Sequence, residues 1–219
     1  MALNIEQARF NMVEQQVRTW EVLDPRVLDV LKTVPREDFV PTRYRKMAFA
    51  DLRLPIGEGE VMMKPLEEGR LLQALALEPG QRVLEIGSGS GFLTACLAAL
   101  GGEVLSLEIH ARLHEQAAAS LRRAEIAGPE LRCADALSFP LESEAFDVVV
   151  ITASVPVVPE HFLKSVAPSG RLFAVRGQGP AMEAVCLSRL ASGRWHVDSL
   201  FETDLPRLRG AEDRPTFDF

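Results

Sequence analysis

Residues 83–91 read Val83-Leu84-Glu85-Ile86-Gly87-Ser88-Gly89-Ser90-Gly91, an apolar run that ends in three glycines at alternate positions. A short apolar run bounded by glycine is typical of a buried strand, and the next segment, GFLTACLAAL (91–100), has the character of a helix. Glycines between a strand and a helix permit positive φ and lack a Cβ, so a ligand can lie directly against the backbone. The first N–H groups of the helix then point at that ligand. This stretch therefore predicts a ligand-binding turn in an α/β protein.

Strand and helix patterns alternate from residue 81 onward. The expected strands are QRVLEI (81–86), EVLSLE (103–108), LRC (131–133), AFDVVVIT (145–152) and GRLFAVR (170–176). The expected helices between them span residues 91–100, 111–126 and 159–167. This alternation predicts a parallel sheet covered on both faces. Two further apolar segments, 182–190 and 194–201, are joined by Ala-Ser-Gly and predict an antiparallel hairpin.

Residues 1–79 predict helices and loops. Apolar residues at helical spacing indicate a helix over Leu3–Trp20, and Asp24 followed by Pro25 is the start signal of a second helix. Residues 53–65 contain two glycines and two prolines and predict an extended segment or loop, followed by a helix over Glu67–Leu77. We therefore predict one domain over 1–219, with an N-terminal helical region at 1–79 and a sheet core at 80–219.

Composition restricts the class of protein. The 219 residues are 47% hydrophobic and 25% charged, which is ordinary for a globular protein, and the net charge is −7. The short basic cluster Arg43, Arg45 and Lys46 is flanked by acids, so we interpret it as a solvated face and expect no nucleic-acid partner. No apolar stretch approaches 18 residues and the N-terminus has no apolar signal core. These features predict a cytoplasmic protein with no membrane partner.

The metal-binding residue types are sparse. Cys96, Cys133 and Cys186 are far apart and have small or apolar neighbours, which predicts buried free thiols in a reducing compartment. His110 and His114 have i, i+4 spacing but lack the ligand set of a zinc site, so we expect no metal.

The glycine spacing indicates which ligand the turn binds. Dinucleotide sites usually have G-x-G-x-x-G, whereas this chain has G-x-G-x-G preceded by Glu85. A carboxylate there would repel a pyrophosphate but would suit the ammonium and sulfonium of S-adenosylmethionine (SAM). Glu108 ends the next strand, where an acid accepts hydrogen bonds from both ribose hydroxyls, and Asp135 follows the third strand, where it would take the adenine amino group. The predicted cofactor contacts are Glu85, Ile86, Gly87, Ser88, Gly89, Gly91, Glu108, Ile109, Asp135, Ala136 and Thr152.

Residues 82–100 resemble the cofactor motif of the protein-L-isoaspartate O-methyltransferase family. The similarity extends to three other segments and covers most of residues 10–180: MVEQQVRTWEVLDPRVLDVLKTVPREDFVP (12–41), LPIGEGE (54–60) and AFDVVVITASVPVVPEHFLKSVAPSGRLFAV (145–175). Segments VPREDFVP and LPIGEGE distinguish this family from other methyltransferases. The resemblance implies a seven-stranded, doubly wound, Rossmann-like SAM-dependent methyltransferase fold with an N-terminal helical extension and a C-terminal antiparallel hairpin.

The resemblance also implies an activity: transfer of a methyl group from SAM to the free carboxylate of L-isoaspartyl or D-aspartyl residues in damaged proteins. The products are a methyl ester, which collapses to a succinimide, and S-adenosylhomocysteine. A carboxylate with a pKa of about 4 is already ionised at neutral pH and needs no general base. The enzyme has only to align the reacting atoms and exclude water.

The segment that follows LPIGEGE departs from the family pattern. The family usually has a Thr-Ile-Ser-Gln-Pro-Tyr type sequence whose serine lies in the acceptor site. This chain has Val61-Met62-Met63-Lys64-Pro65-Leu66, which we call the acceptor segment, so Met63 replaces the serine and Leu66 the aromatic residue. The expected acceptor-site residues are Met63, Lys64 and Thr152. The Lys64 ammonium would bind the acceptor carboxylate or else be a solvated loop lysine, and Thr152 would bind the acceptor or cap a turn.

Several alternatives stay open at this point. One is a diverged paralogue that methylates another acceptor, and a second is a non-catalytic SAM-binding protein. A third is a nicotinamide-dependent oxidoreductase, which the glycine spacing and Glu85 disfavour. The chain is expected to be a monomer or a homodimer, and the tail Phe217-Asp218-Phe219 is expected to pack on its own domain or on a second subunit.

Overall fold

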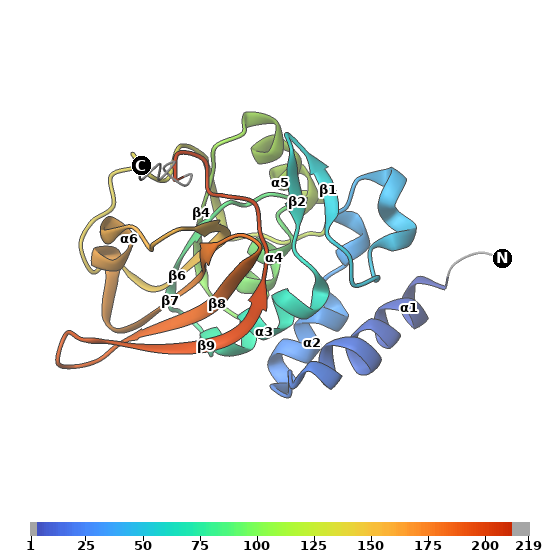
Figure 1. Ribbon diagram of the computed structural model, residues 1–219. Coiled ribbons are helices and arrows are strands. Elements are labelled where there is room, and N and C mark those ends of the chain that lie inside the picture. Colours follow the sequence, from blue (N-terminus) through green and yellow to red (C-terminus); the bar gives the residue numbers. More distant parts are fainter. Residues whose placement is uncertain (1–3, 212–219) are drawn as a thin grey trace, which may run out of the picture.

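The computed structural model describes residues 4–211, and its centre is a twisted seven-stranded sheet (Figure 1). The strand order is β5-β4-β3-β6-β7-β8-β9. Strands β3, β4, β5, β6 and β7 run parallel to one another, whereas β8 pairs antiparallel with both β7 and β9. The strands are β3 Arg82–Ile86, β4 Glu103–Glu108, β5 Glu130–Cys133, β6 Phe146–Val155, β7 Val166–Gln178, β8 Ala181–Arg189 and β9 Trp195–Thr203. The predicted mostly parallel sheet and its C-terminal hairpin are confirmed. The tail Phe217-Asp218-Phe219 lies outside the described residues.

Helices cover both faces of this sheet, and each face has its own hydrophobic core. Successive strand residues point to opposite faces, so Val83 belongs to the core under helices α4 and α5, whereas Leu84 belongs to the core that contains Phe162 of α6. The helices are α4 Phe92–Ala99, α5 Ala111–Arg123 and α6 Glu160–Ser165. This alternation decides where Glu85 points, because Glu85 has the same orientation as Val83.

The last of these helices is shorter than predicted. The sequence pattern predicted a helix over 159–167, but α6 ends at Ser165 and β7 already begins at Val166. Val166 has extended backbone angles, φ −77° and ψ 126°. The residue before a proline is disfavoured in the helical region, so Pro168 prevents Ala167 from continuing the helix.

The N-terminal region packs against α4 and contributes to the same core as β3 (Figure 1). Its elements are α1 Ile5–Asn11, a π-helical turn Met12–Val17, a 3-10 turn Arg18–Trp20, α2 Pro25–Thr33 and α3 Pro65–Leu75. The predicted first helix is therefore divided into three types of turn, and the predicted helix Glu67–Leu77 begins and ends two residues earlier. The Asp24 side chain accepts a hydrogen bond from the Arg26 N–H over 2.8 Å, which confirms the predicted N-cap. A core shared by both parts is what we expect if they fold as one domain.

Between α2 and α3 the chain forms a small hairpin, β1 Leu54–Gly57 and β2 Glu60–Met62, where an extended segment or loop was predicted. The basic cluster that was interpreted as a solvated face lies on an exposed 3-10 turn, Thr42–Met47. Within residues 4–211, no helix is both long and apolar enough to span a membrane.

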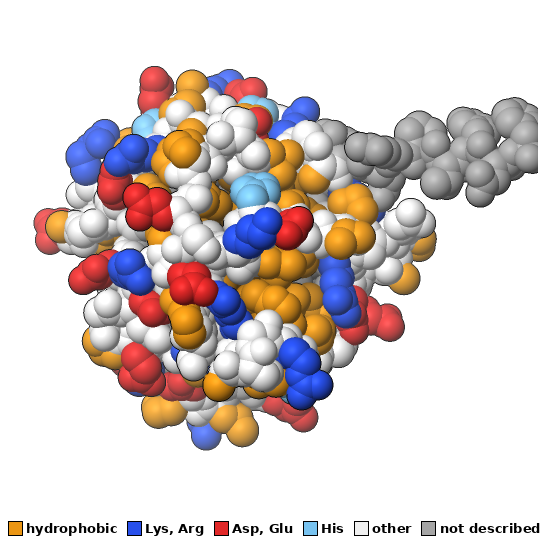
Figure 2. Space-filling view, turned by 90° about the vertical axis from the view of Figure 1, so that its left-hand side faces the viewer, with side chains coloured by type: hydrophobic (Ala, Val, Ile, Leu, Met, Phe, Trp, Pro, Cys, Tyr) orange, Lys and Arg blue, Asp and Glu red, His pale blue; other side chains and the backbone are white. Residues whose placement is uncertain are grey.

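Two cysteines lie in the core, as predicted, but Cys133 is exposed. The prediction for Cys133 is wrong because β5 is an edge strand of the sheet and is mostly exposed, and Cys133 is its last residue. Apolar side chains also reach the surface on the face that carries α6, where Figure 2 shows a group of them ringed by charged side chains. A groove there is lined by Val157, Val158 and Leu163.

The chain returns to the sheet after β9. Residues 205–209 run along the carboxyl end of β6, where the Ser154 N–H donates to the Pro206 carbonyl and the Leu208 N–H donates to the Ser154 carbonyl, each over 2.8 Å. We call this stretch the C-terminal segment; its return to the sheet was not predicted from the sequence.

Candidate active site

The sheet changes its winding direction between β3 and β6, and a cleft opens at the carboxyl ends of these strands. Ligands of open α/β sheets bind at such a switch point. The glycine loop, Gly87–Gly91, forms one wall, and the C-terminal segment and the acceptor segment approach from the other side. The cleft is lined by Ile56, Val61, Met63, Glu68, Gly87, Gly89, Glu108, Ile109, His110, Leu113, Thr152 and Leu205–Arg209.

The glycine loop has a backbone that favours glycine. Gly87, Gly89 and Gly91 have φ angles of 93°, 51° and 84°. A Cβ on Gly87 would lie 2.4 Å from Thr152 Oγ1, so the loop and β6 are too close for a side chain at this position. The loop thus leaves its backbone open to the cleft, as expected for a ligand that rests on it.

Glu85 lies behind this loop rather than on the cleft. Its side chain is fully buried, and Oε2 accepts hydrogen bonds from Thr94 Oγ1 (2.5 Å) and Ser106 Oγ (2.6 Å). Ser106 Oγ also lies 2.6 Å from Ser88 Oγ, so the carboxyl group is connected to the glycine loop through one hydroxyl. Burial raises the pKa of Glu85 to about 7 against the lowering effect of the two hydroxyl bonds. This position follows from the strand alternation that turns Glu85 toward α4.

Glu108, at the end of β4, is a carboxylate that lines the cleft. Its Oε2 accepts from the Gly89 N–H over 2.9 Å and its Oε1 accepts from the His110 N–H over 3.0 Å. Each carboxylate oxygen has a second lone pair, so both remain able to accept another hydrogen bond. The two backbone donors fix the orientation of the carboxylate, which suits the binding of a vicinal diol.

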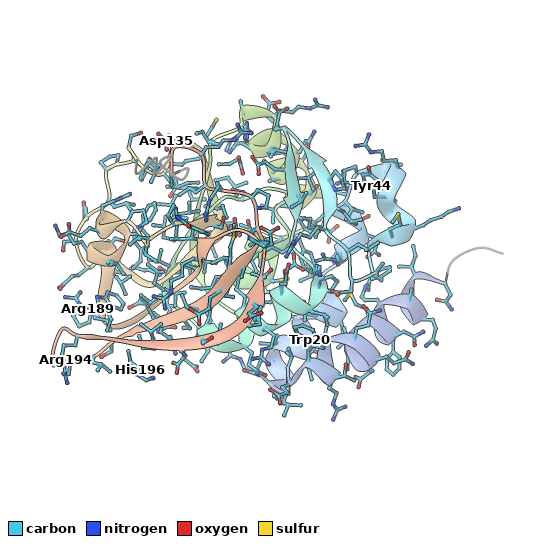
Figure 3. The ribbon with its side chains drawn as sticks, in the orientation of Figure 1. Trp20, Tyr44, Asp135, Arg189, Arg194 and His196 are labelled. Atoms are coloured by element: carbon cyan, nitrogen blue, oxygen red, sulfur yellow. The ribbon has the colours of Figure 1, made fainter. Side chains whose placement is uncertain are left out.

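A second part of the cleft lies beside the ends of β4 and β5. It is lined by Ile109, Asp135 and Ala136, together with Leu208 and Arg209 of the C-terminal segment. Asp135 lies at the sheet edge (Figure 3), where Oδ1 accepts from the Leu137 N–H over 2.9 Å. An exposed apolar side chain next to a carboxylate, as in Ile109 and Asp135, fits a planar aromatic amine.

The acceptor segment lies next to the glycine loop. Met63 lines the cleft together with Ser88, Gly89 and Thr152, so the structure brings together these predicted residues. The Thr152 hydroxyl lies 2.9 Å from the Ile86 carbonyl and 2.8 Å from the Gly87 carbonyl and donates to the loop. Its hydrogen is therefore used in holding the turn, which agrees with the turn-capping alternative.

Lys64 points elsewhere. It lines a neighbouring cavity whose wall also carries Arg53, Leu66, Phe201 and Thr203. Within the described part of the chain, the Lys64 ammonium makes no ion pair. We call this space the outer cavity, and it lies on the far side of the acceptor segment from the glycine loop.

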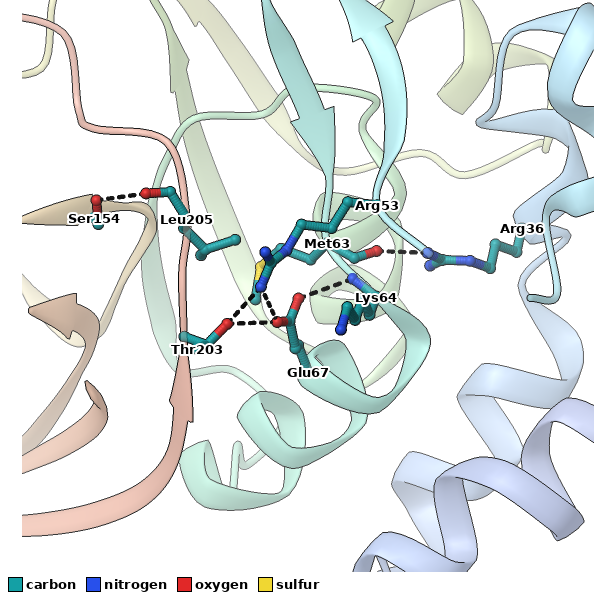
Figure 4. A network of polar contacts seen from close by, with 8 residues as sticks. All are labelled: Arg36, Arg53, Met63, Lys64, Glu67, Ser154, Thr203 and Leu205. Carbon is teal, nitrogen blue, oxygen red and sulfur yellow. Dashed lines mark hydrogen bonds and ion pairs between the residues drawn. The ribbon is translucent and has the colours of Figure 1, made fainter. Parts of the chain in front are cut away.

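A polar network fixes the wall between the two spaces (Figure 4). Glu67 Oε1 accepts from Arg53 Nη2 (2.5 Å) and from Thr203 Oγ1 (2.6 Å), and Glu67 Oε2 accepts from the Lys64 N–H (3.0 Å). This network joins the residue before β1, the start of α3 and the end of β9. Arg53, Glu67 and Thr203 were not among the predicted site residues, because nothing in their spacing along the sequence indicates that they meet.

The comparison with known proteins decides the family. The model of the family "Protein-L-isoaspartate(D-aspartate) O-methyltransferase (PCMT)" matches residues 7–200. The chain belongs to the protein-L-isoaspartate (D-aspartate) O-methyltransferase family. The resemblance described under Sequence analysis is thereby confirmed, and the nicotinamide-dependent oxidoreductase alternative is wrong.

Relatives within the protein-L-isoaspartate O-methyltransferase family match almost the whole chain. Protein-L-isoaspartate O-methyltransferase 2 of Marinobacter nauticus is 34% identical over 214 residues, which is 97% of each protein. The protein-L-isoaspartate O-methyltransferase of Methylorubrum populi is 35% identical over 204 residues, which is 93% of this chain and 96% of that protein. These relatives support the same family over the N-terminal helices and the sheet.

A solved structure confirms the fold. The crystal structure of a beta-aspartate methyltransferase (PCMT) from Plasmodium falciparum, in complex with S-adenosyl-L-homocysteine, superposes with a TM-score of 0.78. It is 20% identical and covers 95% of this chain and 99% of that one. The protein-L-isoaspartate O-methyltransferase fold therefore extends through the N-terminal helices to the C-terminal hairpin.

Proposed function

We propose that this protein transfers a methyl group from SAM to the free carboxylate of L-isoaspartyl or D-aspartyl residues in damaged proteins, giving a methyl ester and S-adenosylhomocysteine. The observation that carries the proposal is that one cleft, in a member of this family, is bounded by the glycine loop, by Glu108 and by the acceptor segment. Bound SAM supplies the electrophilic methyl group.

The residues of the cleft fit such a cofactor. The two free lone pairs of Glu108 suit the ribose hydroxyls, and Ile109, Asp135 and Ala136 suit the adenine ring and its amino group. Gly87 and Gly89 leave room for the methionine part against the backbone. Glu85 acts indirectly in this proposal, because its hydrogen bond to Ser106 supports Ser88 from behind.

Methyl transfer to a carboxylate requires alignment of the reacting atoms and does not require a general base. The acceptor is ionised at neutral pH, and the cleft beside Thr152 presents no Ser-His or Cys-His pair among its described lining residues. Met63 and Leu205 are apolar and buried, at 6% and 3% exposure, and they exclude water from the point where the acceptor would approach.

The direct test uses a pair of peptides that differ only in an isoaspartyl or an aspartyl residue. We expect labelled methyl to pass from SAM to the isoaspartyl peptide alone, with S-adenosylhomocysteine binding measured by calorimetry on the same sample. Tight binding without labelling of either peptide would contradict the proposed acceptor and favour a paralogue with another substrate or a non-catalytic binding protein.

Replacing Glu108 by alanine tests the ribose contact. We expect the Kd of S-adenosylhomocysteine to rise about 10- to 100-fold, because two charge-assisted hydrogen bonds are lost. Glu103→Ala is the matched control, since Glu103 is an exposed acid at the other end of β4. Calorimetry on both variants decides, and an equal Kd for the two would refute the assignment.

Lys64→Ala tests the acceptor contact. If the ammonium binds the acceptor carboxylate from the outer cavity, the KM for the isoaspartyl peptide should rise about tenfold through loss of one charge-assisted bond. Lys46→Ala, on the exposed Thr42–Met47 turn, controls for the loss of a positive charge. An unchanged KM and kcat in Lys64→Ala would leave Lys64 as a solvated loop lysine.

A further inference from the structure

Arg36 is a charged side chain enclosed in the protein, with 1% of its surface exposed. Its Nε donates to the Ala48 carbonyl over 2.8 Å, its Nη2 donates to the Met63 carbonyl over 2.7 Å, and its Nη1 pairs with the Glu68 carboxylate. The guanidinium carbon also lies 4.6 Å from the centre of the Phe92 ring. Each guanidinium nitrogen therefore has an acceptor, and one face of the group packs on an aromatic ring.

These partners belong to both walls of the cleft. The Met63 carbonyl is part of the acceptor segment, and Phe92 is the first residue of α4, directly after the glycine loop. Figure 4 shows that Arg36 approaches Met63 from the side opposite to Arg53 and Thr203. Arg36 thus links the backbone of the acceptor segment directly to the helix that follows the glycine loop.

Stability alone does not account for an arginine here. A buried ion pair can usually be replaced by apolar side chains of similar volume without loss of stability, because desolvation of the charges offsets their attraction. Burial is strong enough to raise the pKa of Glu68 to about 8 despite the opposing effect of Arg36. What apolar residues could not supply is a planar donor group that reaches a loop carbonyl and a carboxylate at once.

We propose that Arg36 is a positioning residue for methyl transfer: through the Met63 carbonyl and the Phe92 ring it fixes the acceptor segment relative to the glycine loop. This inference rests on the proposed function, since the acceptor carboxylate has to meet the methyl group in line. Misplacement of reacting groups by about 1 Å costs about 100-fold in rate, so a loop held by one guanidinium can control kcat without touching the substrate.

The double variant Arg36→Met/Glu68→Leu separates positioning from stability. It leaves no buried charge without its partner, so the loss of stability is limited to the unpaired Ala48 and Met63 carbonyls, and we expect the thermal midpoint to fall by about 5 to 15 °C, which thermal unfolding measures separately from kcat. The kcat for the isoaspartyl peptide should nevertheless fall about tenfold or more, because the Met63 carbonyl loses its donor. A double variant that is as active as wild type would refute the positioning role.

The matched control is Arg9→Met/Glu37→Leu. Arg9 and Glu37 form a similar pair in the same helical region, with Nη2 and Oε1 2.5 Å apart and side chains 17% and 7% exposed. Neither residue contacts the acceptor segment through any hydrogen bond of the described residues. We expect the kcat of this control to equal that of wild type. A loss of kcat as large as in the Arg36 variant would mean that general loosening of the N-terminal region, and not positioning by Arg36, lowers the rate.

Arg36→Lys provides a second variant in case the double variant does not fold. Lysine keeps a positive charge opposite Glu68 but lacks the fork that serves two further carbonyls. We expect a folded protein with kcat reduced about tenfold and with the Kd of S-adenosylhomocysteine within about threefold of wild type. Full activity of Arg36→Lys would show that charge alone suffices and would overturn the inference.

A readout without substrate distinguishes this inference from the proposed function. The 13C-methyl signal of Met63, assigned with Met63→Leu, should shift or broaden in the Arg36 variants and stay unchanged in the Arg9 control. If wild type does not methylate the isoaspartyl peptide, the proposed function fails, and the Met63 signal still decides whether Arg36 fixes the acceptor segment. An unchanged signal in both Arg36 variants would overturn the positioning role.

Discussion

Gly87→Ala is expected to lower the affinity for S-adenosylhomocysteine about 100-fold or more. The new Cβ would lie 2.4 Å from Thr152 Oγ1 on a backbone with φ of 93°, so the loop or β6 has to move. Backbone strain and displacement of this size cost about 1–3 kcal/mol, and they occur where the ligand rests on the loop. Calorimetric titration gives the Kd, and thermal unfolding shows how much of the change is general destabilisation.

Gly193→Ala is the matched control for this substitution. Gly193 also has a positive φ, 77°, but a Cβ there would meet nothing within 4 Å, and the residue lies in the β8–β9 turn. It therefore carries the strain of a left-handed alanine without the collision. The interpretation fails if the two variants bind S-adenosylhomocysteine equally well.

Glu85→Gln is expected to remove much of a pH dependence of folding stability. The pKa of Glu85 is raised by burial from 4.5 to about 7. Below pH 4.5 both the folded and the unfolded forms are protonated, and above it the unfolded chain releases a proton that the folded protein keeps. Stability is thus lost as the pH rises from about 4.5 through about 7, by an amount on the order of 3 kcal/mol.

Urea unfolding at pH 5 and pH 7.5 measures this effect. The glutamine amide oxygen can still accept from Thr94 and Ser106, so Glu85→Gln should be more stable than wild type at pH 7.5 and nearly equal to it at pH 5. Glu68 contributes a dependence of the same sign, because its pKa is raised to about 8, and its contribution should persist in the variant. Glu160→Gln, an exposed acid on α6 with a lowered pKa, serves as control. Identical pH profiles for Glu85→Gln and wild type would contradict the buried carboxyl described above.

The position of the glycine loop and Glu108 on one cleft could be predicted from sequence, because these residues follow local rules. Gly87, Gly89 and Glu108 stand at the ends of strands that the apolar pattern reveals, and parallel strands bring their carboxyl ends to one edge. Glu85 shows the limit of that reasoning. Its place in the sequence suggested a contact with the ligand, but the period-2 alternation that it shares with Val83 turns the side chain toward α4. The sequence already contains this alternation, but it was not used to decide which way Glu85 points.

The surroundings of the acceptor segment could not be predicted in the same way, because the residues that contact it come from distant parts of the chain. Arg36 donates to Met63 across 27 positions and Arg53 donates to Thr203 across 150, and no periodicity reports such pairs. The C-terminal segment was missed for a related reason: Leu205–Arg209 form no regular element beyond one bridge between Ser154 and Arg207. Residues in irregular segments follow no helical or strand periodicity, so their contacts cannot be predicted from a sequence pattern.

The network around Glu67 has a consequence for the order in which the protein is made. Thr203 joins Glu67 from 136 residues further along the chain, so the wall of the outer cavity stays incomplete until Thr203 has been synthesised and has left the ribosome. The glycine loop, Glu108 and Asp135 emerge well before it, together with the strands that carry them. Contacts of such long sequence separation form late in folding. During its synthesis the protein therefore has the glycine loop and Glu108 first and gains the complete wall of the outer cavity only with β9.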